Sequence, residues 1–206
     1  MRQKEDAMKE YNFLKMQKRL CKYMDEDRFV HTMGVMYTSC ALAMRYGINM
    51  EKARVAGLLH DSAKCMPNSK KLKICKRENI PVTDVEMENP FLLHAKLGVY
   101  IAREKYGVED REILQAIRYH NTGRPEMTLL EKIIYIADYI EPNRDKAPNL
   151  PQVRRLAFVD LDESMYVILR DTLSYLEEGG GSIDRTTEKA YAFYKKIHER
   201  KESENG

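Results

Sequence analysis

Apolar residues recur with a helical period along almost the whole chain, and no segment shows the convincing alternation of a strand. The pattern predicts a first helix over 4–24 and a second from the acidic residues at 25–27 to Tyr46, where Gly47 should end it. Further helices are expected at 50–63, 68–78, 91–106, 109–120, 128–141, 160–177 and 184–201. The segments 79–90 and 142–151 are expected to be irregular. The fold class is therefore expected to be all-α, a bundle of about eight to ten helices.

The length of 206 residues suits one domain with a substantial core and is short for two. Residues 1–24 are expected to form an N-terminal helix packed on a core that spans 25–178. The glycine run at 179–181 should be a flexible connector to a C-terminal helix within 179–206, which belongs to the same domain.

Composition and charge limit the function. The chain is 43% hydrophobic and 33% charged, as in a globular domain, and its 35 basic and 32 acidic residues are interspersed to a net charge of +3. A dedicated nucleic-acid binder would concentrate a basic face, whereas a small anionic substrate needs only a local cluster of cations. The cysteines lack disulfide spacing, the charged N-terminus lacks a signal-peptide pattern, and no run reaches the roughly 20 apolar residues of a membrane span. We therefore expect a cytoplasmic protein without membrane contact.

Most of the histidines lie on apolar helical faces. His120 shares a face with Ile113 and Ile117, and the same kind of spacing surrounds His31, His60 and His94. Asp138 lies in the apolar run LEKIIYIADYI, which offers it no obvious cation from its own helix. A buried carboxylate without a partner costs several kcal/mol, so something else must neutralise Asp138.

Each of these residues alone is more typical of ordinary structure than of a ligand. A single histidine on an apolar face is usually a satisfied core residue, and a single buried aspartate is usually a cap or an ion-pair partner. Four inward histidines and two inward aspartates from five helices would leave many polar groups to satisfy separately. One shared metal centre satisfies all of them. The joint pattern therefore predicts metal ligands at His31, His60, Asp61, His94, His120 and Asp138.

The order of these residues resembles the H…HD…H…H…D pattern of the HD superfamily of metal-dependent phosphohydrolases. The segments RFVHTMGV, EKARVAGLLHDSAK, LLHAKLGVYIAREKYGV and AIRYHNTGRPEMTLLEKIIYIADYIEPNR further resemble the YqeK family of symmetrical bis(5′-nucleosyl)-tetraphosphatases. The resemblance covers about residues 25–175 and implies a single HD-domain helical bundle that splits diadenosine tetraphosphate into two ADP. The chain departs from the family after Asn143-Arg144, where it has DKAPNLPQV in place of a Pro-Gly pair.

The resemblance also implies how two metals would share the six ligands. One metal would take His31, His60, Asp61 and Asp138, and the other Asp61, His94 and His120, with Asp61 as the bridge. Imidazole and carboxylate ligands suit iron, manganese, zinc or cobalt better than magnesium or calcium, and the family resemblance favours dinuclear iron. Such a centre activates water for attack on a phosphorus atom, so Asp61 is also a candidate catalytic residue.

A polyphosphate substrate carries several negative charges, so cationic side chains are expected near this centre to bind it. Lys64 follows Asp61 by three residues and is expected to act in both catalysis and substrate binding. Arg144, Thr122 and Gly123 are further candidates for substrate contact, although Gly123 fits an ordinary helix C-cap equally well. The basic stretch 69–73 is expected to be a solvated helix face.

Other functions stay open at the level of sequence. They are another HD phosphohydrolase activity on a different nucleotide or a phosphomonoester, a dinuclear-iron oxygenase of the same superfamily, and a nucleotide-binding regulator whose metals only stabilise the fold. Lys64 and Arg144 favour a phosphate substrate over an oxygenase substrate. The sequence does not decide whether the chain forms a homodimer.

Overall fold

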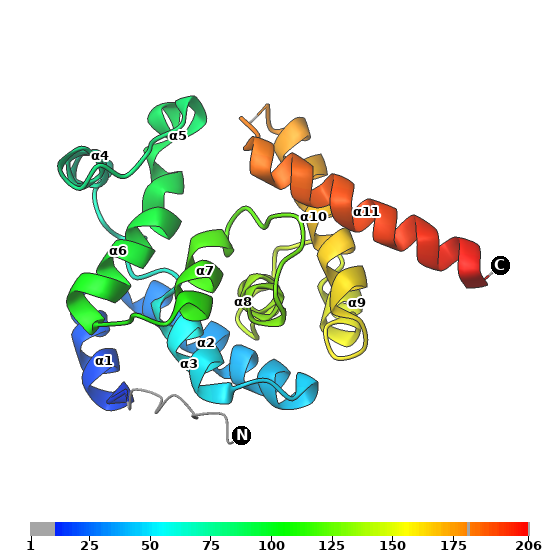
Figure 1. Cartoon of the computed structure of the whole chain (residues 1–206), viewed down its shortest axis with the longest axis horizontal. Coiled ribbons are helices and arrows are strands. Elements are labelled where there is room, and N and C mark those ends of the chain that lie inside the picture. The colour runs from blue at the N-terminus through cyan, green and yellow to red at the C-terminus, as the bar shows by residue number, and fades with distance from the viewer. Residues whose placement is uncertain (1–10, 181, 206) are drawn as a thin grey trace, which may run out of the picture.

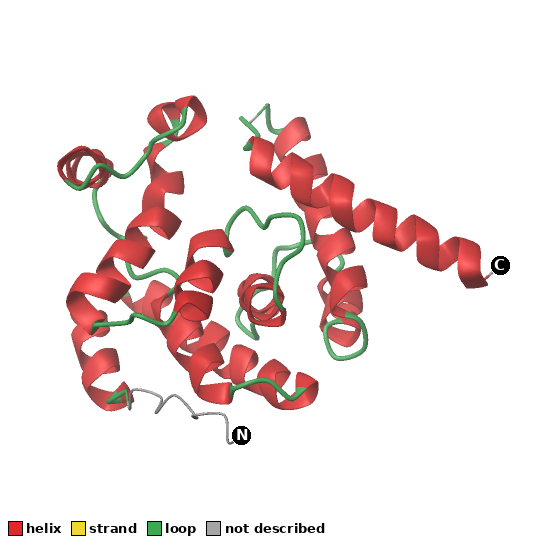
Figure 2. Cartoon of the chain, in the orientation of Figure 1, coloured by secondary structure: helices red, strands yellow, loops and turns green. Residues whose placement is uncertain are grey.

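The computed structural model describes residues 11–180 and 182–205, and these residues form helices and no strand (Figure 2). The α-helices are α1 (Phe13–Leu20), α2 (Glu26–Tyr46), α3 (Met50–Leu59), α4 (Asn68–Arg77), α5 (Asp84–Glu88), α6 (His94–Tyr106), α7 (Arg111–Tyr119), α8 (Leu129–Ile140), α9 (Leu150–Leu156), α10 (Leu161–Glu178) and α11 (Arg185–Asn205). Two 3-10 helices, η1 (Cys21–Tyr23) and η2 (Pro90–Leu93), precede α2 and α6. The all-α prediction is confirmed.

Two short helices in the described residues were not expected, and they raise the number of α-helices above the range of eight to ten. In α5, Thr83 and Glu86 form a reciprocal capping box that starts one turn and a half of helix inside the segment 79–90. In α9, Leu150 and Val153 are buried, so tertiary packing stabilises a helix that begins inside 142–151. The first predicted helix is shorter than expected, because α1 begins after the N-cap Asn12, and residues 4–10 lie outside the described residues.

The ends of the long helices follow from their capping residues. The side chain of Asp25 accepts a hydrogen bond at the N-terminus of α2, and Gly47 ends that helix in the left-handed conformation with φ of 67°. Gly107 ends α6 in the same way. Thr128 and Glu131 form a capping box that begins α8. These caps set the positions from which the chemistry-bearing side chains project.

Helix α8 is central to the architecture and is seen end-on in Figure 1. It contacts α2, α3 and α7 on one side and α9 and α10 on the other, while α11 packs on α10. Leu130 and Ile134 of α8 belong to an apolar cluster shared with α1, α2, α3, α6 and α7. Ile133 and Ile136 belong to a second cluster shared with α9, α10 and α11. Asp138 therefore lies on a helix whose remaining surface is mostly buried.

Helices α2 and α3 approach closely at Gly57. A Cβ atom added there would lie 2.9 Å from the Cα atom of Met36, so only glycine lets the two backbones come this near. The close approach places the C-terminal end of α3, which carries His60, against the face of α2 that carries His31.

The four cysteines are free thiols, as their spacing predicts. Across residues 11–180 and 182–205, no helix combines the length and the apolar character needed to cross a membrane.

Candidate metal centre

Five helices bring the six predicted ligand residues to one place. His31 lies on α2, His60 is the C-cap of α3, Asp61 follows it, His94 begins α6, His120 is the C-cap of α7, and Asp138 lies on α8. Asp138 is partly exposed and the other five are buried. The convergence that the sequence pattern predicts is present, and metal binding by these residues stays a prediction.

Each histidine uses its Nδ1 atom to hold the ring in place. In His60, His94 and His120, Nδ1 lies 2.7, 2.7 and 2.8 Å from the backbone carbonyl oxygen three residues earlier. A carbonyl oxygen only accepts hydrogen bonds, so Nδ1 carries the proton and Nε2 presents a lone pair. In His31, Nδ1 lies 3.1 Å from Oε1 of Glu141, and donation to that carboxylate fixes the same tautomer.

The Nε2 lone pairs converge on Asp61. His94 Nε2 and His120 Nε2 are 3.1 Å apart, and each lies 3.4 Å from Oδ1 of Asp61. The other carboxylate oxygen, Oδ2, lies 3.9 Å from His31 Nε2 and 3.6 Å from His60 Nε2. The two oxygens of Asp61 therefore face two different pairs of histidines, which is the arrangement required of a carboxylate that bridges two cations.

The cluster fits a cation and is poorly satisfied by hydrogen bonds alone. His31 Nε2, His60 Nε2 and Asp61 Oδ1 are buried and have no hydrogen-bond partner, and such atoms cost about 1–3 kcal/mol each. His31 Nε2 also lies 3.0 Å from Oδ1 of Asp138, so two lone-pair atoms face each other. A cation between them turns this repulsion into attraction. Four imidazoles with two carboxylates form a donor set suited to divalent transition metals.

The electrostatics of the cluster favour the ligand forms of these residues. Burial lowers the pKa of His60 to about 4 and the pKa of His94 to about 3, so both rings are neutral at pH 7. Burial alone would raise the pKa of Asp61, but the neighbouring histidines, His60 first among them, and Lys64 together hold the pKa well below its usual range. The pKa of Asp138 is also lowered against the effect of burial, mainly by its close neighbours His31 and His60. Neutral imidazoles and ionised carboxylates are already in the protonation state that binds a metal, so no proton has to leave first.

The two cations predicted near the centre are both there. Lys64 Nζ lies 3.3 Å from Nε2 of His94. Arg144 donates from Nη2 to Oδ1 of Asp138 at 2.9 Å and from Nε to the backbone oxygen of the same residue. Their contact with a substrate stays a prediction.

Two further residues border the cluster without having been predicted. Arg28 donates from Nη1 to Oδ2 of Asp61 at 2.9 Å, and it precedes His31 by one turn of α2, a spacing that could have placed it on the same face. Glu141, the partner of His31, follows Asp138 by three residues but lies past the end of α8, where helical periodicity gives no information about direction.

Lys71 corrects the expectation that the stretch 69–73 is a solvated helix face. Its residue exposure is only 2%, and its Nζ atom donates to the backbone oxygen of Lys64 and to Oδ1 of Asn68. Burial is the main cause that lowers the pKa of Lys71. The buried ammonium group thus ties α4 to the turn that carries Lys64.

Thr122 and Gly123 lie in the turn after α7. Thr122 donates from Oγ1 to the backbone oxygen of Gly123, and Gly123 has φ of +64° and donates its N–H to the backbone oxygen of Tyr119. A Cβ atom on Gly123 would face Ala190 and Met127. Gly123 therefore allows the left-handed turn that ends α7, and a substrate contact by either residue stays a prediction.

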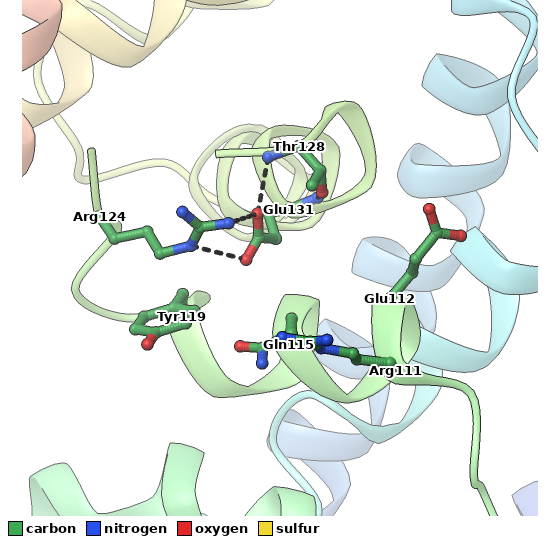
Figure 3. Close-up of a pocket in the computed structure, with 7 residues that line it drawn as sticks. All are labelled: Arg111, Glu112, Gln115, Tyr119, Arg124, Thr128 and Glu131. Carbon is green, nitrogen blue, oxygen red and sulfur yellow. Dashed lines mark hydrogen bonds and ion pairs between the residues drawn. The ribbon is translucent and has the colours of Figure 1, made fainter. Parts of the chain in front are cut away.

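A pocket of about 430 Å³ lies between α7 and the start of α8 (Figure 3). It is lined by Arg111, Glu112, Gln115, Tyr119, Arg124, Thr128 and Glu131. Arg124 donates to both carboxylate oxygens of Glu131 there, so the arginine of the loop after His120 is already paired (Figure 3). None of the six clustered histidines and aspartates lines this pocket, so it is a different place from the candidate metal centre.

The fold and the cluster define the class of the protein: an all-helical domain with histidines and aspartates gathered where its central helices meet. The family model of the HD domain matches residues 28–143, and this range contains all six clustered residues. Hydrolases with this domain bind divalent metals.

Known proteins are similar over most of the chain. A symmetrical bis(5′-nucleosyl)-tetraphosphatase of Bacillus subtilis (strain 168) is 45% identical over 153 residues, which cover 74% of this chain and 81% of the relative. The protein of the same name from Staphylococcus aureus (strain NCTC 8325 / PS 47) is 36% identical over 162 residues, 77% of this chain and 82% of the relative. The crystal structure of a predicted HD superfamily hydrolase from Clostridium acetobutylicum, described as involved in NAD metabolism, superposes with a TM-score of 0.87 at 37% identity and covers 92% of this chain and 100% of its own. The chain therefore belongs to the HD-domain family and, within it, to the family of the symmetrical bis(5′-nucleosyl)-tetraphosphatases.

Proposed function

We propose that this protein hydrolyses diadenosine tetraphosphate with water to two ADP at a dinuclear metal centre. The observation that carries the proposal is that the two oxygens of Asp61 face different pairs of unprotonated Nε2 atoms, one from His31 and His60 and one from His94 and His120. Two positions that share one carboxylate suit phosphoanhydride hydrolysis, which needs a nucleophile and compensation of negative charge at adjacent points.

The side chains of the cluster prepare this site before any substrate arrives. The Nδ1 hydrogen bonds fix each imidazole, so no histidine has to change tautomer or rotate. Asp61 and Asp138 are ionised and supply the negative charge. When bound here, divalent cations lower the pKa of water towards about 7 and offset the charge on phosphoryl oxygens.

Three cationic side chains support binding of a polyphosphate. The side chains of Arg28 and Arg144 are 29% and 41% exposed, whereas the side chain of Asp61 is 3% exposed, so the arginines extend from the buried cluster towards solvent. A phosphate chain that approaches the cluster meets their guanidinium groups first, and guanidinium groups bind phosphate oxygens in a fork geometry. Lys64, beside His94, is proposed to neutralise charge on the phosphoryl group that is attacked.

The resident metal is proposed to be iron, by resemblance to the family, with manganese, zinc or cobalt as substitutes that the same donor set accepts. The substrate is proposed to be a small nucleotide, and the cytoplasmic location expected from the cysteines stays a prediction, as does the question of a homodimer.

Product analysis tests the proposal directly. The purified, metal-loaded protein is incubated with diadenosine tetraphosphate, and the nucleotides are separated by chromatography. Formation of two ADP supports the proposal, and formation of ATP and AMP contradicts symmetrical cleavage. Cleavage of other nucleotides with diadenosine tetraphosphate left intact would favour the alternative of a different HD phosphohydrolase. Asp61→Ala is the negative control, and Glu131→Gln, which alters a buried carboxylate away from the cluster, is the matched positive control.

A further inference from the structure

Glu141 stands out because it is a fully buried carboxylate that contacts a candidate ligand without facing the centre of the cluster. It is 1% exposed, and its Oε1 atom lies 3.1 Å from Nδ1 of His31. The other three clustered histidines direct Nδ1 to backbone carbonyl oxygens instead. His31 is thus the one histidine of the cluster whose Nδ1 partner is a carboxylate oxygen.

The position of the Glu141 carboxylate is fixed from several sides. Its Oε2 atom accepts hydrogen bonds from the backbone N–H of Asn143 at 2.8 Å and from the Asn143 side-chain amide at 2.9 Å. Its backbone oxygen accepts from Nη2 of Arg154 at 3.0 Å and from the N–H of Arg144 at 3.0 Å. These contacts fix the side chain so that Oε1 faces His31 and accepts a hydrogen bond from its Nδ1–H.

Helix α2 leaves the space that this carboxylate occupies. Gly34 lies one turn after His31, and a Cβ atom added to Gly34 would lie 2.3 Å from Oε2 of Glu141. Any larger residue would push the carboxylate away. Gly34, His31 and Glu141 therefore form one packed unit that spans α2 and the end of α8.

We propose that Glu141 is a positioning residue that holds His31 in the ligand tautomer, raises the electron density on its Nε2 atom, and makes the metal position formed by His31, His60 and Asp138 the tighter of the two. A carboxylate that accepts from Nδ1 increases the basicity of the imidazole more than a neutral carbonyl oxygen does. The position near His94 and His120 has carbonyl partners only and takes its negative charge from Asp61 alone. This inference rests on the proposed metal centre but not on the identity of the nucleotide.

Metal titration of the full chain tests this inference. Chelator-treated protein is titrated with Mn²⁺, and the free ion is followed by its electron paramagnetic resonance signal. The unaltered chain is expected to bind two ions in unequal steps.

Glu141→Ala should weaken the tighter step by about 10- to 100-fold and change the weaker step much less. Glu141→Gln should weaken it less, because an amide oxygen can still accept from Nδ1. Gly34→Ala should weaken the same step with every polar group retained, because the added methyl group displaces the Glu141 carboxylate that accepts from His31.

Two controls separate positioning from general stability. Glu131→Gln changes another fully buried carboxylate, in α8, and should leave both binding steps unchanged even where it lowers the melting temperature. In the metal-free protein, long-range ¹H–¹⁵N spectra should show His31 protonated at Nδ1, and Gly34→Ala and Glu141→Gln should increase the fraction protonated at Nε2.

Unchanged binding steps and an unchanged His31 tautomer in these variants would overturn the inference and leave the proposed function intact. Equal weakening of both steps would overturn the assignment of Glu141 to one position. If the unaltered chain binds no Mn²⁺, iron or zinc, the metal centre and this inference fail together. Should Glu141→Ala fail to fold, Glu141→Gln and Gly34→Ala decide the matter.

Discussion

The two metal positions should respond differently to replacement of the two aspartates by asparagine. Oδ1 and Oδ2 of Asp61 face different pairs of histidines, whereas Asp138 approaches only His31 and His60, at 3.0 and 3.9 Å. Asp61→Asn should therefore impair both positions, and Asp138→Asn only one. The substituted side chains keep their shape but lose the charge and exchange one carboxylate oxygen for an NH2 group, so each variant removes a ligand oxygen without a change of volume.

The expected size follows from linkage between metal binding and folding. A metal present at 100 times its dissociation constant stabilises the folded state by about 2.7 kcal/mol for each position. For a chain of 206 residues, 1 kcal/mol shifts the melting temperature by about 2–4 °C. Each filled position should therefore raise the melting temperature by roughly 5–11 °C. With Mn²⁺ at 100 times the weaker dissociation constant, the unaltered protein should show at least twice this increment, Asp138→Asn about one increment, and Asp61→Asn almost none.

Thermal unfolding followed by circular dichroism, with chelator and then with Mn²⁺ at 100 times the weaker of the two wild-type dissociation constants, measures these shifts. Elemental analysis of dialysed samples counts the ions. Each shift is taken relative to the metal-free melting temperature of the same variant, because removing a carboxylate that pairs with Arg28 or Arg144 lowers the stability by itself. A full wild-type shift in Asp61→Asn would refute Asp61 as the shared ligand. Equal losses in the two variants would refute the existence of two separable positions.

Three further outcomes are expected. Lys64→Ala should lower kcat by roughly 100-fold with metal content unchanged, because Lys64 lies beside His94 and is proposed to neutralise charge on the attacked phosphoryl group; unchanged turnover in a steady-state assay would remove it from the mechanism. Arg28→Ala should raise KM about tenfold or more, with a smaller change in kcat, because its guanidinium group reaches solvent; a loss of metal with KM unchanged would show instead that it only holds the bridging carboxylate. The metal-free protein should lose stability as the pH falls from about 6.5 towards 4, because burial lowers the folded-state pKa of His60 to about 4 and of His94 to about 3, so the unfolded chain binds more protons in this window. Urea unfolding at several pH values measures the slope, and His94→Gln should make it shallower; a flat profile above pH 4.5 would contradict the burial of these rings.

Sequence periodicity was sufficient to find the six clustered residues because each lies at or near a helix whose apolar face is continuous. A histidine such as His120, spaced by three and seven residues from buried isoleucines, must point where they point. Bulk and charge decide which face of a helix is buried, and the order of residues along the chain carries that information. The resemblance to a known family added the pairing of ligands, which periodicity alone does not contain.

Short helices and single buried charges were harder to foresee. Helix α9 has no more than two turns, and it forms because Val153 belongs to the second apolar cluster and Leu156 packs against that cluster. Lys71 lies among other basic residues, so the local pattern indicates solvent. Its burial depends on two acceptors: the side chain of Asn68, one turn earlier in α4, and the backbone oxygen of Lys64, which only the folded turn before α4 brings within reach.

The contact between Glu141 and His31 could not be predicted from the sequence. It lies past the last turn of α8, so no helical face constrains its side chain, and its partner His31 is 110 residues away in the chain. A glutamate before a proline at a helix end is compatible with a solvated side chain as well as with a buried one. The more informative residue is Gly34, because a glycine inside a long helix costs about 1 kcal/mol relative to alanine and is therefore expected to serve a close contact. One turn from a predicted ligand, such a glycine indicates that something from another segment fills the space beside the histidine. The structure identifies that group as the carboxylate of Glu141.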